Sequence, residues 1–337
     1  MAEKMSAGLL QPLIYTLAGV VVLVTLLPFW RTDRWWVRIC DFPRFQIAVV
    51  AGILVAALAY LRWPGTAVDW IVTALLAGVL VWQGSWVWGY LPGAPKAVAQ
   101  SRRPANDPAC ITLFIANVMQ TNRNSDELLA IIADADPDVI LLAETDEWWS
   151  AQLSRRLEVS YRHRLCHPLP TGYGLALFSR LDLIEPTVRH VIDKDVPSIR
   201  TGVQLRSGDI VDLYGVHPPP PAPAQGSAER DTELLVTGRE VKARGRPAIV
   251  LGDLNDVAWS RTTLQFQQAG GLRDPRRGRG FYSTFHAKLP GLRYPLDYVF
   301  HTPHFRVGKL RVLPHFGSDH LPLVAVLCYE PMDVNGV

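Results

Sequence analysis

Three long stretches without a charged residue occupy the first third of this 337-residue chain. They run through residues 5–30, 45–61 and 70–95, and they consist mostly of Leu, Val, Ala, Ile and Trp. About 20 apolar residues cross a bilayer as a helix, which satisfies its own backbone hydrogen bonds where no water is present. The sequence therefore predicts three transmembrane helices, the second of which is near the lower limit of length.

Tryptophans mark the ends of these stretches, as an interfacial aromatic belt would. They are Trp30, Trp35, Trp36, Trp63, Trp82, Trp86 and Trp88. A buried core helix is the alternative for any single stretch, but three in succession favour a membrane. A cleaved signal peptide fits the first stretch poorly, because no small-residue cleavage pattern follows it and further membrane segments do.

The chain divides into three parts. Residues 1–91 form the predicted transmembrane domain, and residues 92–108, rich in Pro, Ala and Gly, read as a linker. Residues 109–330 suit one globular domain of about 220 residues. In that domain many short apolar strands alternate with few helices, which predicts two packed sheets with helices outside.

The predicted strands of this domain are residues 111–116, 139–143, 175–179, 183–191, 201–205, 210–216, 248–251, 295–301, 305–313 and 321–329. The predicted helices are residues 124–135, 148–157, 228–243 and 260–269. The run Pro218–Pro221 can only be loop or polyproline II.

Charge and cysteine content exclude some classes. A formal net charge of +3 is too small to indicate a nucleic-acid partner, and the arginines clustered at residues 273–279 are more typical of solvated surface. Beside a membrane such arginines could meet anionic headgroups. The four cysteines lack zinc-site spacing. Cys110 opens the first strand and Cys328 closes the last, so a disulfide can form if these strands are neighbours, and it would favour an oxidising compartment.

Polar residues gather where the apolar strands end or begin. These residues are Asn117, Glu144, His217, Asp253, Asn255, Asp319 and His320. Taken singly each is a weak signal, since Asp and Asn after a strand are usually turn residues, Glu144 could cap a helix, and His217 could be a satisfied surface histidine. Asp297 is different, because an acid flanked by Leu and Tyr inside an apolar strand needs a partner to offset its desolvation.

Together these residues suit a metal-assisted hydrolytic site. Carboxylate and amide oxygens are ligands for a hard cation, and a histidine can transfer protons to or from water. One firm carboxylate with further oxygen ligands suits Mg²⁺, or Mn²⁺ in its place, better than zinc.

In this order the motifs resemble the endonuclease/exonuclease/phosphatase (DNase I-like) superfamily. Its members are Mg²⁺-dependent phosphohydrolases that include DNase I, apurinic endonucleases, neutral sphingomyelinases and inositol polyphosphate 5-phosphatases. The matching segments are Asn117, Leu141–Glu144, Tyr173–Ala176, Val216–His217, Gly252–Asn255, Leu296–Tyr298 and Ser318–His320. The resemblance implies a four-layer α/β sandwich in which two mixed sheets are flanked by helices.

The resemblance also implies a role for each site residue. Glu144 would be the principal Mg²⁺ ligand, assisted by Asn117 and by Asp319. Asp297 would orient His320, the general base toward the attacking water. Asp253 would position that water or the phosphate, Asn255 would donate to a non-bridging oxygen, and His217 would stabilise the phosphate or help protonate the leaving group. Arg200 and Thr284 lie in segments that border the site in the family.

Three membrane helices ahead of such a domain look like a bacterial subset that includes the teicoplanin-resistance membrane protein. For that subset the resemblance implies a phosphorylated lipid or envelope precursor as substrate, with undecaprenyl pyrophosphate as a candidate and a link to glycopeptide resistance. The basic and aromatic insertions with which DNA-cleaving members grip a duplex are not evident, so no stable nucleic-acid partner is expected. A membrane-bound nuclease and a non-catalytic binding protein are the alternatives.

Two indications of membrane topology disagree. The loop between the first two helices contains Arg31, Arg34, Arg38 and Arg44, so the positive-inside rule places this loop and the catalytic domain in the cytoplasm. The resemblance to the teicoplanin-resistance protein places the domain outside the cell. We expect a multi-pass membrane protein whose catalytic domain is extracytoplasmic.

Overall fold

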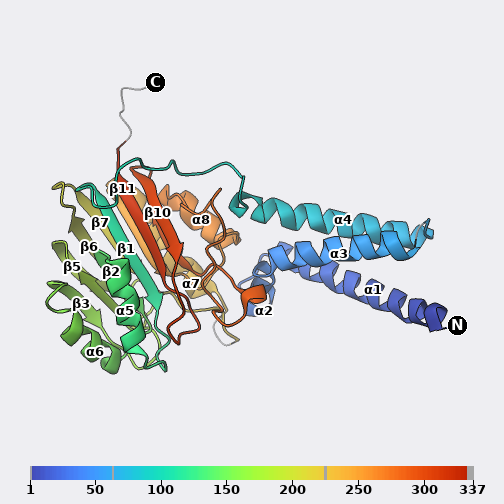
Figure 1. The fold of residues 1–337 in the computed structure, drawn as a ribbon, viewed down its shortest axis with the longest axis horizontal. Helices are drawn as coiled ribbons and strands as arrows, with labels where there is room; N and C mark the ends of the chain where they lie inside the picture. Colours follow the sequence, from blue (N-terminus) through green and yellow to red (C-terminus); the bar gives the residue numbers. More distant parts are fainter. Residues whose placement is uncertain (1, 63, 224–225, 332–337) are drawn as a thin grey trace, which may run out of the picture. The chain divides into compact units, whose positions relative to one another are not determined.

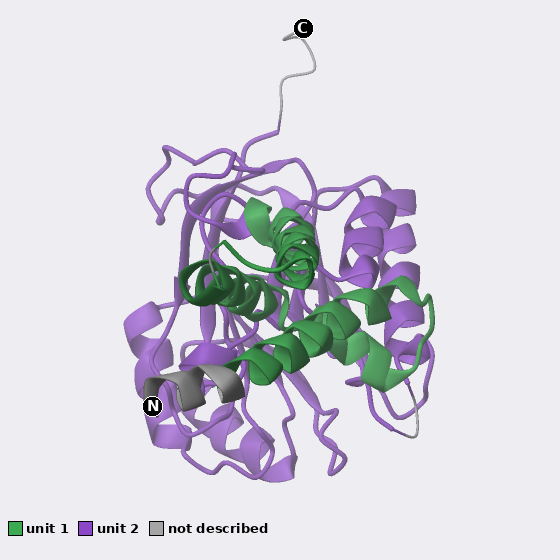
Figure 2. Ribbon diagram, turned by 90° about the vertical axis from the view of Figure 1, so that its right-hand side faces the viewer, with its two compact units in different colours: residues 1–89 green, residues 90–337 purple. Residues whose placement is uncertain are grey.

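The computed structural model describes residues 2–62, 64–223 and 226–331. The chain forms two compact units, Met1–Gly89 and Tyr90–Val337, coloured green and purple in Figure 2. Each unit is built from its own segment of sequence, and the boundary falls at the end of the last apolar stretch.

The first unit contains three long helices, α1 (Ala2–Leu26), α3 (Arg44–Arg62) and α4 (Ala67–Val87). With the short 3₁₀ turns that follow α1 (Leu27–Phe29) and α4 (Trp88–Tyr90), they provide three spans of 20, 19 and 24 residues that are long and apolar enough to cross a membrane. Helix α4 begins before the uncharged stretch at residue 70, because Thr66 and Asp69 form a capping box at its start. The short helix α2 (Trp35–Arg38) lies between α1 and α3.

The second unit contains two β-sheets, which Figure 1 shows together with their helices. The six-stranded sheet has the order β10-β11-β1-β2-β4-β3, and the five-stranded sheet has the order β5-β6-β7-β8-β9. The first sheet comprises β1 (Cys110–Asn117), β2 (Val139–Ala143), β3 (His163–His167), β4 (Leu175–Ser179), β10 (Phe305–Val312) and β11 (Leu323–Tyr329). The second comprises β5 (Leu183–Arg189), β6 (Ser198–Gln204), β7 (Ile210–Val216), β8 (Ala248–Asp253) and β9 (Asp297–His301).

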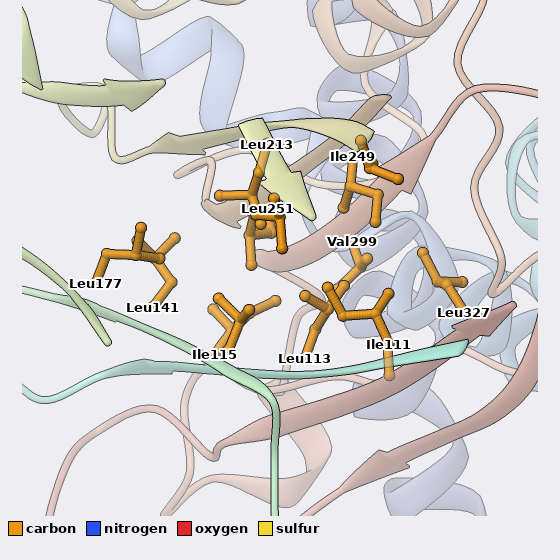
Figure 3. Close-up of a cluster of buried hydrophobic side chains, with 14 of the residues drawn as sticks. Ile111, Leu113, Ile115, Leu141, Leu177, Leu213, Ile249, Leu251, Val299 and Leu327 are labelled. Carbon is orange, nitrogen blue, oxygen red and sulfur yellow. The ribbon is translucent and has the colours of Figure 1, made fainter. Parts of the chain in front are cut away.

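The main hydrophobic core lies between the two sheets. Ile115 and Leu141 of the first sheet face Leu213 and Leu251 of the second, and all four side chains are buried (Figure 3). Each sheet has one parallel pair at its centre, β1 with β2 and β7 with β8. Parallel strands covered on both faces need continuous apolar runs, which explains why these strands were recognisable in the sequence.

Helices cover the outer faces of both sheets. On the first sheet, α5 (Ser125–Ala135) and α6 (Glu147–Leu157) bury Leu128 and Trp149 against Phe114. On the second sheet, α8 (Arg261–Gly270) places the ring of Phe266 5.5 Å from that of Phe300, and α7 (Ala228–Arg244) packs beside α8. The predicted class, a DNase I-like fold of two mixed sheets flanked by helices, is confirmed.

Strand β3 was not predicted. Its sequence, His163–His167, has charged or polar residues at three of five positions and lies at the edge of its sheet, so it carries neither an apolar run nor a clean alternation.

The segment 92–108, expected to be a linker, is held against the domain. The backbone of Ser101 donates to Val307, and Val98 is buried in the core.

A disulfide joins the first and last strands of the second unit. Strands β1 and β11 are antiparallel neighbours, Cys110 lies opposite Cys328, and the two sulfurs are bonded. The neighbour relationship on which the predicted disulfide depended is therefore present. The other two cysteines, Cys40 and Cys166, are free.

Candidate functional site

The polar residues predicted from the sequence converge at one end of the two sheets. The parallel pairing of β1 with β2 brings Asn117 level with Ala143, next to Glu144. The parallel pairing of β7 with β8 brings Val216 level with Gly252, so that His217 and Asp253 follow side by side. Because the carboxyl ends of parallel strands meet at one edge, four strands deliver these side chains to one place.

The two strands that run the opposite way complete this edge. Asp297 opens β9 directly opposite Asp253, in an antiparallel pair. The loop before β11, which contains Asp319 and His320, reaches the end of β1, where the Ser318 hydroxyl donates to the Asn117 carbonyl over 2.8 Å. Residues separated by some two hundred positions in sequence are therefore neighbours here.

His320 lies between two carboxylates. Its Nδ1 is 2.8 Å from Asp297 Oδ2, and its Nε2 is 3.5 Å from Asp253 Oδ2. All three residues are almost fully buried, and their ligand atoms lie within 4.8 Å of one another. The partner that Asp297 required inside its apolar strand is thus the catalytic-candidate histidine.

Burial and neighbouring charges shift the pKa values of His320 and Asp253 in opposite directions. Burial alone lowers the pKa of His320, but Asp297 and Asp253 outweigh it and raise the pKa to about 10. Burial raises the pKa of Asp253, and the neighbouring His320 charge partly offsets this rise. The two carboxylates therefore favour the protonated, positively charged imidazole in the ligand-free protein.

Asn117 connects the two halves of the site. Its Nδ2 donates to Glu144 Oε1 over 2.8 Å and to Asp253 Oδ2 over 3.0 Å, while its Oδ1 accepts from the backbone of Met119. This amide orientation follows from the hydrogen-bond network rather than from visible hydrogens. A metal ligand at Asn117 would need the oxygen to take the place of the nitrogen, so the amide would have to rotate.

Glu144 has the environment of a metal ligand. Its second oxygen accepts from the backbone of Gln120 over 3.3 Å, and within the described part of the chain no basic side chain forms an ion pair with it. The residue adopts a φ of 61°, an unusual conformation for a side-chain-bearing residue that is found preferentially at functional sites. A half-buried carboxylate without a cationic partner among the described residues, beside the Asn117 amide, provides an oxygen donor of the kind that a hard divalent cation takes.

His217 and Asn255 flank Asp253 on the second sheet. The Nε2 of His217 is 3.9 Å from Asp253 Oδ2, and its buried Nδ1 has no hydrogen-bond partner among the described residues. Asn255 has a φ of 51°, and one hydrogen of its Nδ2 is directed to the Pro218 carbonyl over 3.0 Å. The second hydrogen of that amide can still reach a ligand.

Gly252 permits the close approach of β7 and β8 at the site. Its φ is +140°, and a Cβ there would lie 1.9 Å from the carbonyl oxygen of Val216. No side chain fits in that space, so the glycine of the Gly-Asp-Leu-Asn motif is required for the backbone and not for the chemistry. It places His217 and Asp253 at the same level of the sheet.

Three further residues take part in the site. The Gln120 backbone contacts Glu144, the ring of Phe285 lies 4.9 Å from that of His320, and Ser318 Oγ accepts from the His320 backbone over 3.0 Å. Only Ser318 had a signal in the sequence, as part of the Ser-Asp-His motif.

The two residues expected to border the site have other partners. Arg200 forms an ion pair of 3.4 Å with Glu240 of α7, and Thr284 Oγ1 accepts a hydrogen bond from the Asp297 backbone.

Comparison with known proteins agrees with this geometry. Residues 113–320 match the model of the Endonuclease/Exonuclease/phosphatase family. An endonuclease/exonuclease/phosphatase from Beutenbergia cavernae DSM 12333 is similar with a TM-score of 0.58 and 21% identity, over 66% of this chain and 72% of that chain. No curated protein matches the chain.

Two eukaryotic structures show the same fold. Humanized D. rerio TDP2 carrying 14 mutations has a TM-score of 0.55 and 19% identity, over 65% of this chain and 99% of that one. The human Nocturnin catalytic domain with bound sulfate has a TM-score of 0.55 and 18% identity, over 66% of this chain and 95% of that one.

Proposed function

The chain belongs to the Endonuclease/Exonuclease/phosphatase family, and we propose that it is a membrane-anchored, metal-dependent hydrolase of a phosphorylated lipid or cell-envelope precursor. Members of this family are generally metal-dependent hydrolases of phosphoester bonds. The observation that supports catalysis in this chain is the buried Asp297–His320–Asp253 triad, joined through Asn117 to Glu144. A binding protein would have no need to bury so many ionisable groups together.

In the proposed reaction a water molecule attacks the phosphorus. His320 receives the proton from this water, and Asp297 holds the imidazole in position through Nδ1. For this step His320 must be neutral, so the proton that Asp297 and Asp253 stabilise on the ligand-free imidazole has to leave before the water attacks. His217 Nδ1 and the second amide hydrogen of Asn255 would donate to phosphate oxygens.

We propose Mg²⁺ as the metal, with Mn²⁺ as a substitute, and Glu144, Asn117 and Asp319 as the residues that hold it. When bound, the cation would neutralise phosphate charge in the transition state. Glu144 is the main support for this proposal. Its carboxylate accepts hydrogen bonds from the Asn117 amide and the Gln120 backbone, and no described residue forms an ion pair with it.

The three apolar helices favour a substrate that is itself in the membrane. A catalytic domain tethered to the bilayer meets lipid-linked substrates at high local concentration without any additional contact. Undecaprenyl pyrophosphate is our candidate, and through it a link to glycopeptide resistance, since a chain with this arrangement resembles the teicoplanin-resistance membrane protein.

We place the catalytic domain on the outer side of the membrane. The Cys110–Cys328 disulfide supports this location, because such bonds persist in oxidising compartments and are rare in the cytosol. The arginine-rich first loop argues for the opposite side. Fusion of alkaline phosphatase or of a fluorescent protein to the carboxyl terminus decides between them, since the first is active only outside and the second fluoresces only inside.

The decisive experiment is a substrate panel with the full-length protein in detergent or vesicles. It contains lipid pyrophosphates, phospholipids, soluble phosphate esters and DNA, each assayed with Mg²⁺ and with EDTA. We expect Mg²⁺-dependent phosphate release from a lipid pyrophosphate, lost in Glu144→Gln and retained in Glu147→Gln, an exposed glutamate three residues away. Cleavage of DNA without phosphate release from lipids would replace this proposal by a membrane-bound nuclease.

A further inference from the structure

A loop formed by residues 286–293 starts beside the catalytic histidine. At its base the Phe285 backbone donates to the Tyr294 carbonyl over 3.0 Å, and Tyr294 donates back to Phe285. Phe285 also forms a bridge with His320, and their rings lie 4.9 Å apart. The 286–293 loop is therefore attached directly to the active-site edge.

Internal hydrogen bonds give the 286–293 loop a defined shape. The Arg293 guanidinium donates to the carbonyl oxygens of His286 and Ala287. The Ala287 backbone donates to the Asp319 carbonyl over 2.7 Å, next to His320, and the Leu289 backbone donates to His286 over 3.0 Å. A loop held in this way presents its tip in one orientation relative to the site.

Two leucines at the tip are exposed to solvent. Leu289 and Leu292 expose 49% and 51% of their surface on a single short turn, and Lys288, Pro290 and Gly291 between and beside them are exposed as well. The other large hydrophobic residues exposed on this unit stand singly along the described chain. Single exposed hydrophobic residues are normal, whereas a fixed pair on one turn indicates a contact surface.

The charges around these leucines have one sign. Lys288 precedes them and Arg293 follows them, and the sequence 286–293 contains no acidic residue. Lys288 has no ion-pair partner within the part of the chain that the structure describes. Apolar residues between basic ones are typical of segments that enter the boundary between lipid headgroups and acyl chains, where anionic headgroups neutralise the charge.

We propose that the 286–293 loop inserts Leu289 and Leu292 into the interfacial layer of the bilayer and holds the active site against it. The site would then take phosphate groups that lie in the headgroup layer, ahead of those free in water. The bilayer is the favoured partner of this loop for two reasons. The three apolar helices would anchor the chain in a membrane, and the positive charges of Lys288 and Arg293 complement anionic lipid headgroups. This inference rests on the proposed lipid substrate.

Insertion can be measured without catalysis. An environment-sensitive fluorophore is attached to Leu292→Cys in the full-length protein, with Cys40→Ser and Cys166→Ser removing the free thiols. Val159→Cys, at a residue 91% exposed on the same unit, is the matched control. In vesicles of phosphatidylcholine and phosphatidylglycerol, we expect a blue-shifted emission at residue 292 that lipid-borne quenchers reduce, and neither effect at residue 159.

Equal emission and equal quenching at both positions in the vesicles would overturn the proposal. So would a blue shift that appears in detergent without lipid and grows with protein concentration, because this result identifies the loop as a contact between copies of the chain. Since neither measurement uses a substrate, the outcome does not depend on whether the proposed activity is correct.

A kinetic test connects insertion to function. The double variant Leu289→Ser, Leu292→Ser should hydrolyse a vesicle-borne lipid pyrophosphate about tenfold more slowly, as loss of two half-exposed leucine contacts implies. Its rate on a soluble phosphate ester should be unchanged. A parallel loss on both substrates would show that the leucines support the site itself, and an unchanged rate on both would remove their role in substrate access.

Discussion

Asn117 of one sheet and Asp253 of the other are joined by a hydrogen bond of 3.0 Å. The same amide nitrogen contacts Glu144 over 2.8 Å, so one side chain fixes the distance between the metal-ligand candidate and the His320 triad. In a sandwich of two sheets, the distance between side chains on different sheets depends on how the core packs. The bond from Asn117 to Asp253 holds the two sheets' site residues at one defined separation.

Replacing Asn117 by Ala should damage both activity and stability. The buried carboxylate of Asp253 loses a donor, which costs about 1–3 kcal/mol in the free energy of unfolding. Since the position of Glu144 is also released, we expect kcat to fall by about a hundredfold. Urea unfolding and steady-state kinetics measure the two effects, with the exposed Asn106→Ala as control. Full activity in Asn117→Ala would show that the two halves are positioned by other contacts.

Replacing His320 by Ala should reduce kcat by about 10²–10⁴-fold, the range typical for loss of a general acid–base group. Asp297→Asn should give a loss of similar order, because the imidazole keeps its place but loses the carboxylate that holds it. His315→Ala, which alters an exposed histidine five residues earlier, is the control. If His320→Ala retained the native kcat on the best substrate of the panel, the triad would not be catalytic.

Binding of metal should raise the thermal stability of the native protein and leave that of Glu144→Gln unchanged. A ligand at a hundred times its Kd stabilises by about 2.7 kcal/mol, which shifts the melting temperature by a few degrees. Differential scanning fluorimetry of the full-length protein with Mg²⁺, Mn²⁺ or EDTA detects this shift without any substrate. An equal shift in Glu144→Gln would place the binding site elsewhere.

Glu233 of α7 should make stability depend on pH. The side chain is buried, one of its oxygens has no hydrogen-bond partner among the described residues, and burial raises its pKa to about 8 despite the nearby Arg189. The unfolded chain has a glutamate pKa of about 4.3, so between these values the folded protein binds more protons. Stability should therefore fall as pH rises through this window and level off above about pH 8.

The variant Glu233→Gln removes this dependence. At pH 8 and above it should be more stable than the native protein by a few kcal/mol at most, and near pH 4 the two should be alike. Melting temperatures across this pH range provide the measurement, and Glu158→Gln, at an exposed position, is the control. A constant difference at every pH would mean that the carboxyl group keeps its usual pKa.

Much of this fold was predictable because its central strands are apolar runs. Strands β2, β4 and β7 have the bounds expected from the sequence, since most of their residues are apolar and buried. Strand β3 was missed because an edge strand needs no such run. Strand β9 begins at Asp297 and not at Pro295, since proline has no N–H to donate to a strand ladder.

The sequence predicted a site residue most clearly where a charged side chain lies within an apolar segment. Asp297, an acid in an apolar strand, required a partner, and His320 is that partner. The bond from Asn117 to Asp253 and the contact of Phe285 with His320 were not predictable, because both depend on how separate segments pack in space. Sequence patterns identify which groups are present, whereas the distances between them come from tertiary structure.

The disulfide between β1 and β11 has a consequence for synthesis. Strand β1 lies between β2 and β11, so the larger sheet remains open until the final strand has left the ribosome. Asp319 and His320 arrive with that same last segment. A prematurely terminated polypeptide would thus lack the disulfide and the reactive histidine at once, so it would be inactive as well as less stable.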